Sequence, residues 1–332
     1  PMRRVTDPLE EMGAQVSYLP ENKAKGLLPV TISGATPVLP ADYHSNIASA
    51  QIKSAILLAG LNARGITKVT EPHISRDHTE AMLRHFGLTV EQTILEDGRH
   101  EVSVAGEGLL RAADIAVPRD PSSAAFAMVA ALITPHSHIT LPGISMNPQR
   151  VGLIATLQEM GGSLILSNHR IEGGEDVADI EVRSSLLHGI DVPEQRAASM
   201  IDEYPILSIA AACASGKTHM VGVSELRVKE TDRIAVMADG LRRCGVKIDE
   251  TDDTMTVFGT NSDGNNSSAH SAISGGVTIA SQHDHRIAMS FLSLGMVSKS
   301  PIIVEDVSTI ATSFPGFVSL MNSAGAKIKR QS

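Results

Sequence analysis

The chain of 332 residues is 42% hydrophobic and carries a formal net charge of −9, with 28 Lys and Arg residues against 37 Asp and Glu residues. This length suits two domains with buried cores, and the acidic balance argues against a protein that binds nucleic acid non-specifically, because such proteins usually present a basic face. No stretch approaches the ~18 consecutive apolar residues of a membrane span, and the two cysteines, Cys213 and Cys244, have no metal or redox spacing, so we expect a protein of the reducing cytoplasm.

Residues 1–34 have the pattern expected for the end of a structural repeat. VTDPLEEMGAQVSY predicts an amphipathic helix that ends at Gly13, and PVTISG predicts the strand that completes a hairpin after it. The apolar helix and strand that open every later copy of the repeat are not found before this segment, and the chain begins with Pro1. We therefore expect that at least part of one repeat is missing on the N-terminal side.

Four copies of the repeat follow along the chain. Each copy opens with a helix that is apolar on nearly all sides, which is typical of buried helices, and a short strand comes next. An amphipathic helix that ends near a glycine and an alternating pair of strands complete the copy. The apolar helices are predicted at 49–65, 122–133, 204–216 and 285–297, and the glycines are Gly87, Gly161, Gly245 and Gly325. The most polar segment, GTNSDGNNSSAHS at 259–271, predicts a mobile hairpin turn in the fourth copy.

Arginines recur at the predicted starts of these helices. Ser, Thr and Asp also stand there, but these residues are ordinary N-caps worth ~1 kcal/mol each and need no further function. A cation in the first turn instead opposes the helix dipole by ~0.3–1 kcal/mol, and it is useful where an anion is held on the free N–H groups. If the repeats pack with their helix starts facing one cleft, several cations converge there on one or two anionic ligands. The recurring arginines are Arg76, Arg150, Arg233 and Arg286.

The stretch ELRVKETDRI, at 225–234, is the most highly charged of these helix starts. Lys229 and Arg233 are expected on one face of the first turn, where they could hold an anion. In the alternative interpretation the cluster is solvated, and Glu230 and Asp232 neutralise the two cations. The stretch alone supports both interpretations equally, and the repetition of arginine elsewhere favours the anion site.

Two weaker signals predict no separate chemistry. His283 and His285 form an H-x-H pair, but no third ligand motif accompanies them, so we predict neither a metal site nor a cofactor. The cysteines are interpreted as core residues rather than nucleophiles. Asp202, in SMIDEYPIL, is by itself explained as an N-cap that precedes Pro205.

Several long motifs together resemble those of the 5-enolpyruvylshikimate-3-phosphate (EPSP) synthase family, and more closely its bacterial class II branch. These motifs are, in chain order, SAQIKSA, ISRDHTE, PRDPSSAAF, SMIDEYPIL, ELRVKETDRI, HDHRIAMSF and IATSFPGF. The resemblance spans essentially the whole chain and implies an α/β fold of the inside-out barrel type, built from repeated βαβαββ units in two domains. It implies that residues 1–116 form an incomplete first domain on the shikimate 3-phosphate side. Residues 117–332 would then form the second domain, with the catalytic aspartate and the arginines that bind phosphoenolpyruvate.

The resemblance also implies a reaction and a set of residues for one of its substrates. The enolpyruvyl group of phosphoenolpyruvate is transferred to the 5-hydroxyl of shikimate 3-phosphate, and phosphate is released without the help of a metal ion. Within this set, Ser49 and Arg76 would contact the phosphate group. The residues implied to bind shikimate 3-phosphate are Ser49, Gln51, Arg76, Asp202 and Lys229.

A second set of residues is implied for phosphoenolpyruvate and for catalysis. Gln51, Arg233 and Arg286 would bind phosphoenolpyruvate. Asp202 would remove the proton from the 5-hydroxyl, and Glu230 would protonate the methylene carbon of the enolpyruvyl group. Addition to an enol ether needs both proton transfers, so two carboxylates with separate tasks suit the reaction.

The resemblance is incomplete in places. The Lys-Ser motif and the Gly-rich Asn-Ala segment of the family are not found in this chain, nor is the arginine that precedes Pro1 and Met2 in the family. Ser313 stands where the plant-like branch has a lysine that contacts phosphoenolpyruvate. We therefore expect this chain by itself to be inactive.

Two alternative functions remain open on the sequence. One is the related enolpyruvyl transferase that acts on UDP-N-acetylglucosamine, and the other is a non-catalytic, anion-binding repeat protein. The carboxylates of Asp202 and Glu230 beside the arginines argue against a mere anion binder, which gains nothing from them. We expect two small-molecule substrates, no nucleic-acid or membrane partner, and a cytoplasmic monomer.

Overall fold

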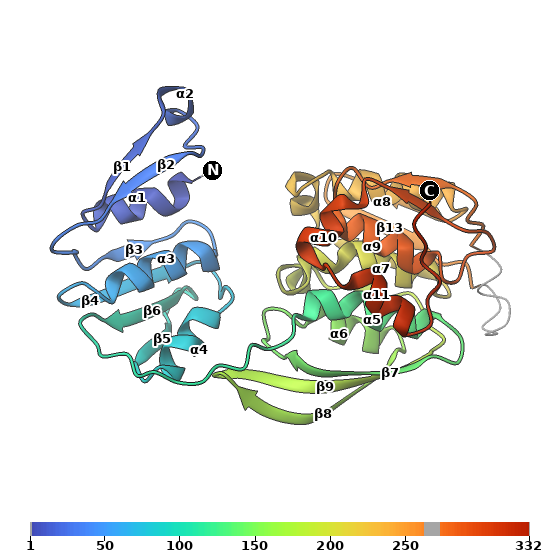
Figure 1. Ribbon diagram of the computed structural model, residues 1–332, viewed down its shortest axis with the longest axis horizontal. Helices are drawn as coiled ribbons and strands as arrows, with labels where there is room; N and C mark the ends of the chain where they lie inside the picture. The colour runs from blue at the N-terminus through green and yellow to red at the C-terminus, as the bar shows by residue number, and fades with distance from the viewer. Residues whose placement is uncertain (1, 262–272, 332) are drawn as a thin grey trace. The chain divides into compact units, whose positions relative to one another are not determined.

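The computed structural model describes residues 2–261 and 273–331, and the chain divides into two compact units (Figure 1). Unit 1 comprises Pro1–Val117 and Ile171–Glu175, and unit 2 comprises Pro118–Arg170 and Asp176–Ser332. Each unit has its own hydrophobic core. The functional domains expected at 1–116 and 117–332 stay a prediction, as do the substrates assigned to them.

Unit 1 is built around a four-stranded sheet with the strand order β3-β4-β6-β5, and β1 and β2 form a separate antiparallel hairpin. Helix α3 packs against β4 and β6, because Ile52, Ile56 and Leu57 on its buried side meet Val69 and Val102 of the two strands in one core. The elements of unit 1 are α1 (Arg3–Glu11), β1 (Gln15–Tyr18), α2 (Pro20–Lys23), β2 (Val30–Ser33), β3 (Asp42–His44), α3 (Ala50–Gly60), β4 (Ile66–Glu71), α4 (His78–His85), β5 (Val90–Ile94) and β6 (His100–Ala105).

Unit 2 contains three sheets and a larger set of helices. The sheets have the orders β7-β9-β8, β10-β11-β13-β12 and β14-β15. The helices of unit 2, including short 3₁₀ turns labelled η, are α5 (Pro121–Ile133), α6 (Gly152–Glu159), η1 (Glu194–Ser199), η2 (Ile201–Glu203), α7 (Tyr204–Ala212), η3 (Ser224–Val228), α8 (Arg233–Arg243), α9 (His285–Leu294), η5 (Val307–Thr309), α10 (Ile310–Ser313) and α11 (Phe317–Ser323). The strands are β7 (His138–Ser145), β8 (Ser163–Glu172), β9 (Glu175–Arg183), β10 (Asp191–Val192), β11 (Lys217–Val221), β12 (Lys247–Glu250), β13 (Thr254–Phe258), β14 (Thr278–Ala280) and β15 (Ile303–Glu305). The end of β8 and the first residue of β9 fall within Ile171–Glu175 and so belong to unit 1.

The predicted apolar helices are confirmed as α3, α5, α7 and α9. In unit 2, α5, α7 and α9 pack against one another inside the unit, where Figure 1 shows them enclosed by the other elements. All nine residues of α7 are buried, as its apolar sequence YPILSIAAA requires. Three helices at the centre with sheets around them are the arrangement expected for the inside-out α/β barrel.

Each repeat opens with a short strand that the sequence pattern did not reveal. Strands β3, β10 and β14 precede the buried helices and pair in parallel with β4, β11 and β15, which follow those helices. In the remaining copy, one parallel bridge between Arg119 and Ile144 takes the place of this strand pair. These strands were missed because two or three residues are too few to show an alternating pattern. With them the repeat is βαβαββ, and the predicted fold class is confirmed.

The amphipathic helices of the repeats are confirmed as α4, α6, α8 and α11. Gly245 follows α8 with φ of +87°, a left-handed conformation that favours glycine and ends the helix there. The hairpin turn predicted at 259–271 lies outside the described residues from 262 onward, and Gly259 directly follows β13. Within the described residues, no helix combines the length and the apolar character needed to cross a membrane.

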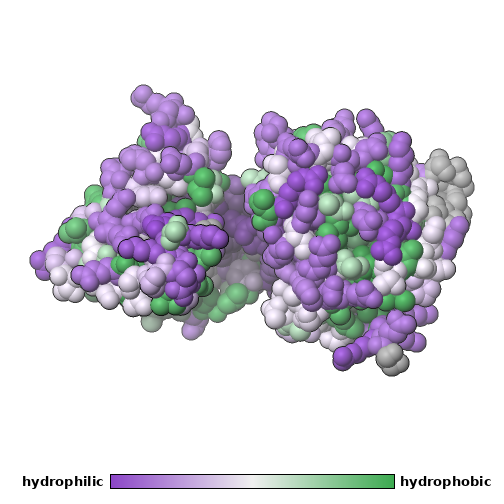
Figure 2. All heavy atoms as spheres, turned by 90° about the horizontal axis from the view of Figure 1, so that it is seen from above, coloured by the Kyte–Doolittle hydropathy of each residue, from purple (hydrophilic) through white to green (hydrophobic). Residues whose placement is uncertain are grey.

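The visible surface of each unit carries hydrophilic side chains interrupted by small hydrophobic patches, as Figure 2 shows. Individual apolar side chains are exposed, such as Ile66 in unit 1 and Val228 in unit 2. Single exposed apolar residues are ordinary in folded proteins and carry no functional argument here.

Candidate functional site

The first turns of the three buried helices of unit 2 contact one another. Asp120 is the N-cap of α5, Asp284 is the N-cap of α9, and Glu203 stands at the N-cap position of α7. Ser122 Oγ in α5 donates a hydrogen bond to Glu203 Oε1 at 2.5 Å, and Arg286 Nη1 in α9 donates to the same oxygen at 3.1 Å. One buried carboxylate therefore joins the starts of three helices that belong to three different repeats.

Arg233, the first residue of α8, is buried and surrounded by carboxylates. Only 1% of its side chain is exposed, and its Nε donates to Asp284 Oδ2 at 2.7 Å. Its Nη1 donates to Asp202 Oδ1 at 3.3 Å, and its Nη2 donates to Glu230 Oε2. A buried guanidinium needs such partners because an unpaired charge in the interior is strongly destabilising. The planar group is thereby held in one orientation with all three of its nitrogens bonded.

Asp202 faces three cations. Besides Arg233, Lys229 Nζ lies 3.6 Å from Asp202 Oδ1, and Arg286 Nη2 lies 3.9 Å from Asp202 Oδ2. Asp202 lies in η2, one residue before the N-cap position of α7, which Glu203 occupies. The N-cap interpretation of Asp202 is therefore wrong. The carboxylate keeps 20% of its surface exposed, so a ligand can reach it.

Lys229 does not lie in the first turn of a helix, and the prediction that it does is wrong. Its backbone is extended after η3, and α8 begins only at Arg233. The reason is that Asp232 is the N-cap of α8, since its carboxylate accepts a hydrogen bond from Ala235 N at 3.0 Å. Lys229 nevertheless extends to the same carboxylate as Arg233, so the two cations meet at Asp202 rather than along a helix face.

The solvated-cluster interpretation of 225–234 is half correct. Glu230 pairs with Arg233, as that interpretation requires, and half of the Glu230 side chain is exposed. Asp232 pairs instead with Arg227, at 2.7 Å, and does not neutralise Lys229. Because Arg233 is buried rather than solvated, the stretch is part of an organised site.

Burial raises the pKa of Glu203 above the ordinary range of a glutamate, and the charge of Arg286 and the hydrogen bond from Ser122 only partly oppose this effect. The group is nonetheless well bonded, because it accepts from both neighbours. Arg286 Nη1 also donates to the backbone oxygen of Asp202 at 3.0 Å. Glu203 and the Asp202 carbonyl thus fix the position of the Arg286 guanidinium.

The raised pKa of Glu203 predicts how stability depends on pH. Below the ordinary glutamate pKa of about 4.3, Glu203 is protonated in both states and its contribution to stability is complete. As pH rises through the raised pKa, the folded state must give up a proton that it holds more tightly than the unfolded state, and stability is lost. The Glu203→Gln variant cannot undergo this loss. Its unfolding free energy relative to the wild type should therefore increase with pH, measured by urea unfolding from about pH 4 to pH 8.

A matched control for this experiment is Glu159→Gln. The hydrogen bond from Arg196 holds the pKa of Glu159 below its usual range, although burial weakly opposes this. The wild type therefore gains stability as Glu159 ionises, and the Glu159→Gln variant should become relatively less stable as pH rises through about 4.3, at the lower end of the measured range, with no further change at higher pH. The prediction would be contradicted if the unfolding free energy of Glu203→Gln, relative to that of the wild type, stayed constant or fell as pH rises.

The network continues to Arg150, another of the recurring arginines. Arg150 Nη2 donates to Asp120 Oδ1 and to Ser122 Oγ, both at 2.7 Å. Ser122 in turn donates to Glu203, as described above, so three hydrogen bonds through Ser122 and Glu203 connect Arg150 with Arg286. Within unit 2 the recurring arginines therefore gather at one place, as the helix-start pattern predicted.

The sequence reasoning missed the carboxylates that hold these arginines. Asp120 and Asp284 were assigned only as N-caps, and both do cap their helices, by accepting from Ser122 N and Arg286 N. Each has a second role, because Asp120 also pairs with an arginine at 2.7 Å and Asp284 pairs with Arg233. The signal that could have revealed this role is the presence of an acid and an arginine together at each helix start.

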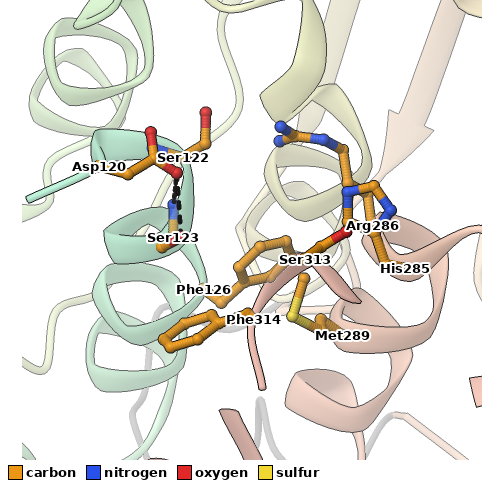
Figure 3. A pocket seen from close by; sticks show the side chains of 9 residues that line it. All are labelled: Asp120, Ser122, Ser123, Phe126, His285, Arg286, Met289, Ser313 and Phe314. Atoms are coloured by element: carbon orange, nitrogen blue, oxygen red, sulfur yellow. Dashed lines mark hydrogen bonds between the residues drawn. The ribbon is translucent and has the colours of Figure 1, made fainter. Parts of the chain in front are cut away.

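A pocket opens beside Arg286 (Figure 3). Arg286 and the first turn of α5 supply polar groups, and Phe126, Met289 and Phe314 supply an apolar side. Burial, followed by the Arg286 charge, lowers the pKa of His285, which favours its neutral form beside the Arg286 guanidinium. The pocket thus combines one guanidinium, the Asp120 carboxylate, hydroxyl groups and apolar side chains. The residues that line the pocket are Asp120, Ser122, Ser123, Phe126, His285, Arg286, Met289, Ser313 and Phe314.

The remaining predicted site residues lie in unit 1. Ser49 is the N-cap of α3 and accepts from Ile52 N at 3.5 Å, and Gln51 is exposed in the same first turn. Arg76 lies in the segment between β4 and α4, directly before the N-cap Asp77. Unit 1 thus also presents polar and cationic groups at the starts of α3 and α4.

The chemistry of metals and thiols is not indicated by the described residues. In the ranges 2–261 and 273–331, no group of three or more His, Cys, Asp or Glu side chains is arranged to hold a metal ion. Burial raises the pKa of Cys213 to about 12 and that of Cys244 to about 11, so both are protonated at neutral pH. Cys244 lies in the hydrophobic core, as predicted, and Cys213 packs against it.

Comparison with known proteins gives consistent matches over the whole chain. The family model described as EPSP synthase (3-phosphoshikimate 1-carboxyvinyltransferase) matches residues 1–321. A curated relative from Rhodospirillum rubrum with the name 3-phosphoshikimate 1-carboxyvinyltransferase is 51% identical over 328 residues, covering 99% of this chain and 70% of the relative. A relative of the same name from Parvibaculum lavamentivorans is 53% identical, covering 98% of this chain and 69% of the relative. The solved structure of an EPSP synthase from Acinetobacter baumannii matches 100% of this chain and 72% of its own, with a TM-score of 0.90 and 46% identity.

Proposed function

The chain belongs to the EPSP synthase family, and on this premise we propose that the carboxylates and cations around Asp202 are the catalytic centre of a 3-phosphoshikimate 1-carboxyvinyltransferase. The enzyme transfers the enolpyruvyl group of phosphoenolpyruvate to the 5-hydroxyl of shikimate 3-phosphate and releases phosphate. The observation that carries the residue assignment is that Asp202, partly exposed, faces Lys229, Arg233 and Arg286.

Asp202 acts as the general base in this proposal. The Asp202 carboxylate is partly exposed, so it can accept the proton of a substrate hydroxyl placed within hydrogen-bond distance. Lys229 contacts shikimate 3-phosphate beside Asp202, since its ammonium lies 3.6 Å from Asp202 Oδ1. The proton leaves the 5-hydroxyl as its oxygen attacks the enolpyruvyl carbon.

Glu230 supplies the other proton. It lies one residue after Lys229, pairs with Arg233, and keeps half of its side chain exposed, so its carboxyl group can meet a substrate carbon. Protonation of the methylene carbon gives the tetrahedral addition intermediate, and later loss of that proton, with loss of phosphate, restores the double bond. The separate positions of Asp202 and Glu230 suit the two separate proton transfers.

The arginines bind the anionic groups of phosphoenolpyruvate. Arg233 and Arg286 are assigned to this substrate, together with Gln51 of unit 1. Glu203 holds the partly exposed Arg286 guanidinium in a fixed orientation, so little conformational entropy is lost when the substrate binds. Arg233 is 1% exposed, so its contact with the substrate requires that Glu230, its half-exposed partner, move away from Nη2. The pocket beside Arg286 combines a cation, hydroxyl groups and apolar side chains, which suits a small three-carbon anion.

Ser49, Gln51 and Arg76 bind shikimate 3-phosphate in this proposal, with Ser49 and Arg76 on the phosphate group. A helix start with a free first turn and a nearby guanidinium is a favourable place for a phosphate dianion. Ser49 caps α3 and Arg76 precedes α4, so both stand at such starts.

UDP-N-acetylglucosamine is not favoured as the acceptor, because relatives with 50–53% identity have the name 3-phosphoshikimate 1-carboxyvinyltransferase.

We further propose that the enzyme is a cytoplasmic monomer. Analytical ultracentrifugation would check the oligomeric state, and a sedimenting dimer would contradict it.

The function is tested by a coupled phosphate-release assay on the full-length enzyme, meaning a chain of the same length as the relatives. Phosphate should be released only when phosphoenolpyruvate and shikimate 3-phosphate are both present, and mass spectrometry should find the enolpyruvyl ether of the acceptor. UDP-N-acetylglucosamine should not replace shikimate 3-phosphate. Phosphate release with that nucleotide sugar, or no release with both expected substrates, would overturn the assignment.

A further inference from the structure

A buried ion cluster in unit 1 joins α3, β4 and α4. Lys53, on α3, is 0% exposed, and its Nζ lies 2.7 Å from Glu80 Oε1 on α4 and 3.0 Å from Glu71 Oε1 at the end of β4. The same Nζ donates to the backbone oxygen of Ser75 at 3.3 Å. Both carboxylates are also buried. A single lysine therefore connects three elements and the segment that leads from β4 to α4.

Glu71 holds the other polar groups of Ser75. Glu71 Oε1 accepts from Ser75 N at 2.9 Å and from Ser75 Oγ at 3.0 Å, and His100 Nδ1 lies 3.3 Å from the same oxygen. The donor N–H, the carbonyl and the hydroxyl of Ser75 are thus all bonded to Lys53 or Glu71. Burial raises the pKa of Glu71, but the Ser75 backbone bond and the charge of Lys53 outweigh this, so the pKa lies below the usual range.

The segment on the far side of Arg76 is tied to α3 as well. Ser54 Oγ, next to Lys53 on α3, is 2.6 Å from Thr79 Oγ1 in the first turn of α4. The backbone of Arg76 therefore lies between two anchor points, Ser75 and Thr79, that are both attached to consecutive residues of one helix. That helix is the one whose N-cap is Ser49.

A buried ion cluster of this kind is poorly explained by stability alone. Desolvation of three charged groups costs several kcal/mol per ion, and well-packed apolar side chains of similar volume are often at least as stable. Unlike apolar side chains, Lys53 and Glu71 form directional hydrogen bonds with every polar atom of Ser75. We propose that Lys53 and Glu71 are positioning residues that set the place of Arg76 and, through it, the affinity for shikimate 3-phosphate. This inference rests on the proposed role of Arg76 in binding that substrate.

The test compares two replacements of Glu71 in the full-length enzyme. Glu71→Met removes the acceptor that holds Ser75, and the Michaelis constant for shikimate 3-phosphate should rise ~10-fold or more, because small displacements of a binding group are costly. The constant for phosphoenolpyruvate and kcat should change much less. Glu71→Gln keeps an acceptor oxygen at Oε1 and should restore most of the affinity. Lys68→Met, which breaks an ion pair with Glu101 on the same sheet, is the matched control and should change neither constant.

Arg76→Ala, alone and combined with Glu71→Met, separates this inference from the proposed function. If Glu71 acts through Arg76, the double variant should be no weaker than Arg76→Ala. If Arg76→Ala leaves the constant for shikimate 3-phosphate unchanged, the proposed role of Arg76 fails. Two outcomes would contradict the positioning role. In the first, Arg76→Ala raises the Michaelis constant for shikimate 3-phosphate and Glu71→Met does not. In the second, Glu71→Met raises the Michaelis constants for both substrates equally. Should Glu71→Met not fold, Glu71→Asp withdraws the carboxylate from Ser75 N and Ser75 Oγ while it keeps the charge beside Lys53, and an unchanged constant there would equally overturn the inference.

Discussion

Replacing Asp202 by alanine should lower kcat of the full-length enzyme by ~10²–10⁴, the range expected for loss of a general base. The carboxylate faces Lys229, Arg233 and Arg286, and we assign the 5-hydroxyl proton to it. Shikimate 3-phosphate should still bind, because its phosphate is assigned to residues outside this cluster. Phosphate release gives kcat, and isothermal titration calorimetry gives the affinity.

The control for this variant is Asp239→Ala. Asp239 lies on α8, is largely exposed, and pairs only loosely with Arg243, at 3.8 Å. Its replacement should leave kcat within about twofold of the wild type, since exposed pairs of this kind contribute little. If Asp202→Ala retained normal turnover, the assignment of Asp202 as the base would be rejected. If both variants lost activity equally, the effect would be a general one on folding.

Replacing Arg233 by alanine should have the largest effect on stability of any change in the site. Arg233 is buried against Asp284, which is 0% exposed, so the variant leaves a buried carboxylate without its guanidinium. Breaking such a pair typically costs about 3–5 kcal/mol of unfolding free energy. Arg242→Ala on the same helix is the control, because Arg242 is about half exposed and its pair with Glu250 is worth at most about 1 kcal/mol. Equal losses in urea unfolding of the two variants would contradict the argument.

The substrate role of Arg233 is tested with Arg233→Lys, which keeps a positive charge beside Asp284 and should fold. Lysine cannot supply two planar donors to an anion while it also pairs with the carboxylates. The Michaelis constant for phosphoenolpyruvate should therefore rise by ~10-fold or more, and that for shikimate 3-phosphate should rise far less. Equal weakening of both substrates would argue against the assignment of Arg233 to phosphoenolpyruvate.

The periodic elements of the fold could be predicted from the sequence, because they are long enough to show a period. The apolar helices α5, α7 and α9 and the glycine after α8, Gly245, are examples. Strands β10 and β14 were not found, since two or three residues carry no alternation, and only their pairing with β11 and β15 defines them. The start of α8 was placed too early because the local charges concealed that Asp232, rather than an earlier residue, is the N-cap.

The arginines of the site could be predicted from the pattern of helix starts, and the buried carboxylates that hold them could not. The recurrence of arginine at helix starts identified Arg150, Arg233 and Arg286. A cation there opposes the helix dipole, so its presence indicates a role other than stabilising the helix. Glu203 and Asp284 are acidic, and an acid at a helix start agrees with the helix dipole. The local sequence therefore explains both as caps and indicates no further role. Their long-range contacts with arginines of other repeats arise only from packing of the helices.

The contact of Ser122, Glu203 and Arg286 across three helix starts has a consequence for folding cooperativity. A ligand at this junction binds a site that exists only when all three repeats are packed together. Its binding free energy therefore adds to the unfolding free energy of the assembled unit and not to that of any single repeat. Saturation at 100 times the dissociation constant would add about 2.7 kcal/mol to the unfolding free energy. That increment would protect backbone amides of α5, α7 and α9 from hydrogen exchange together, although the repeats are far apart in sequence.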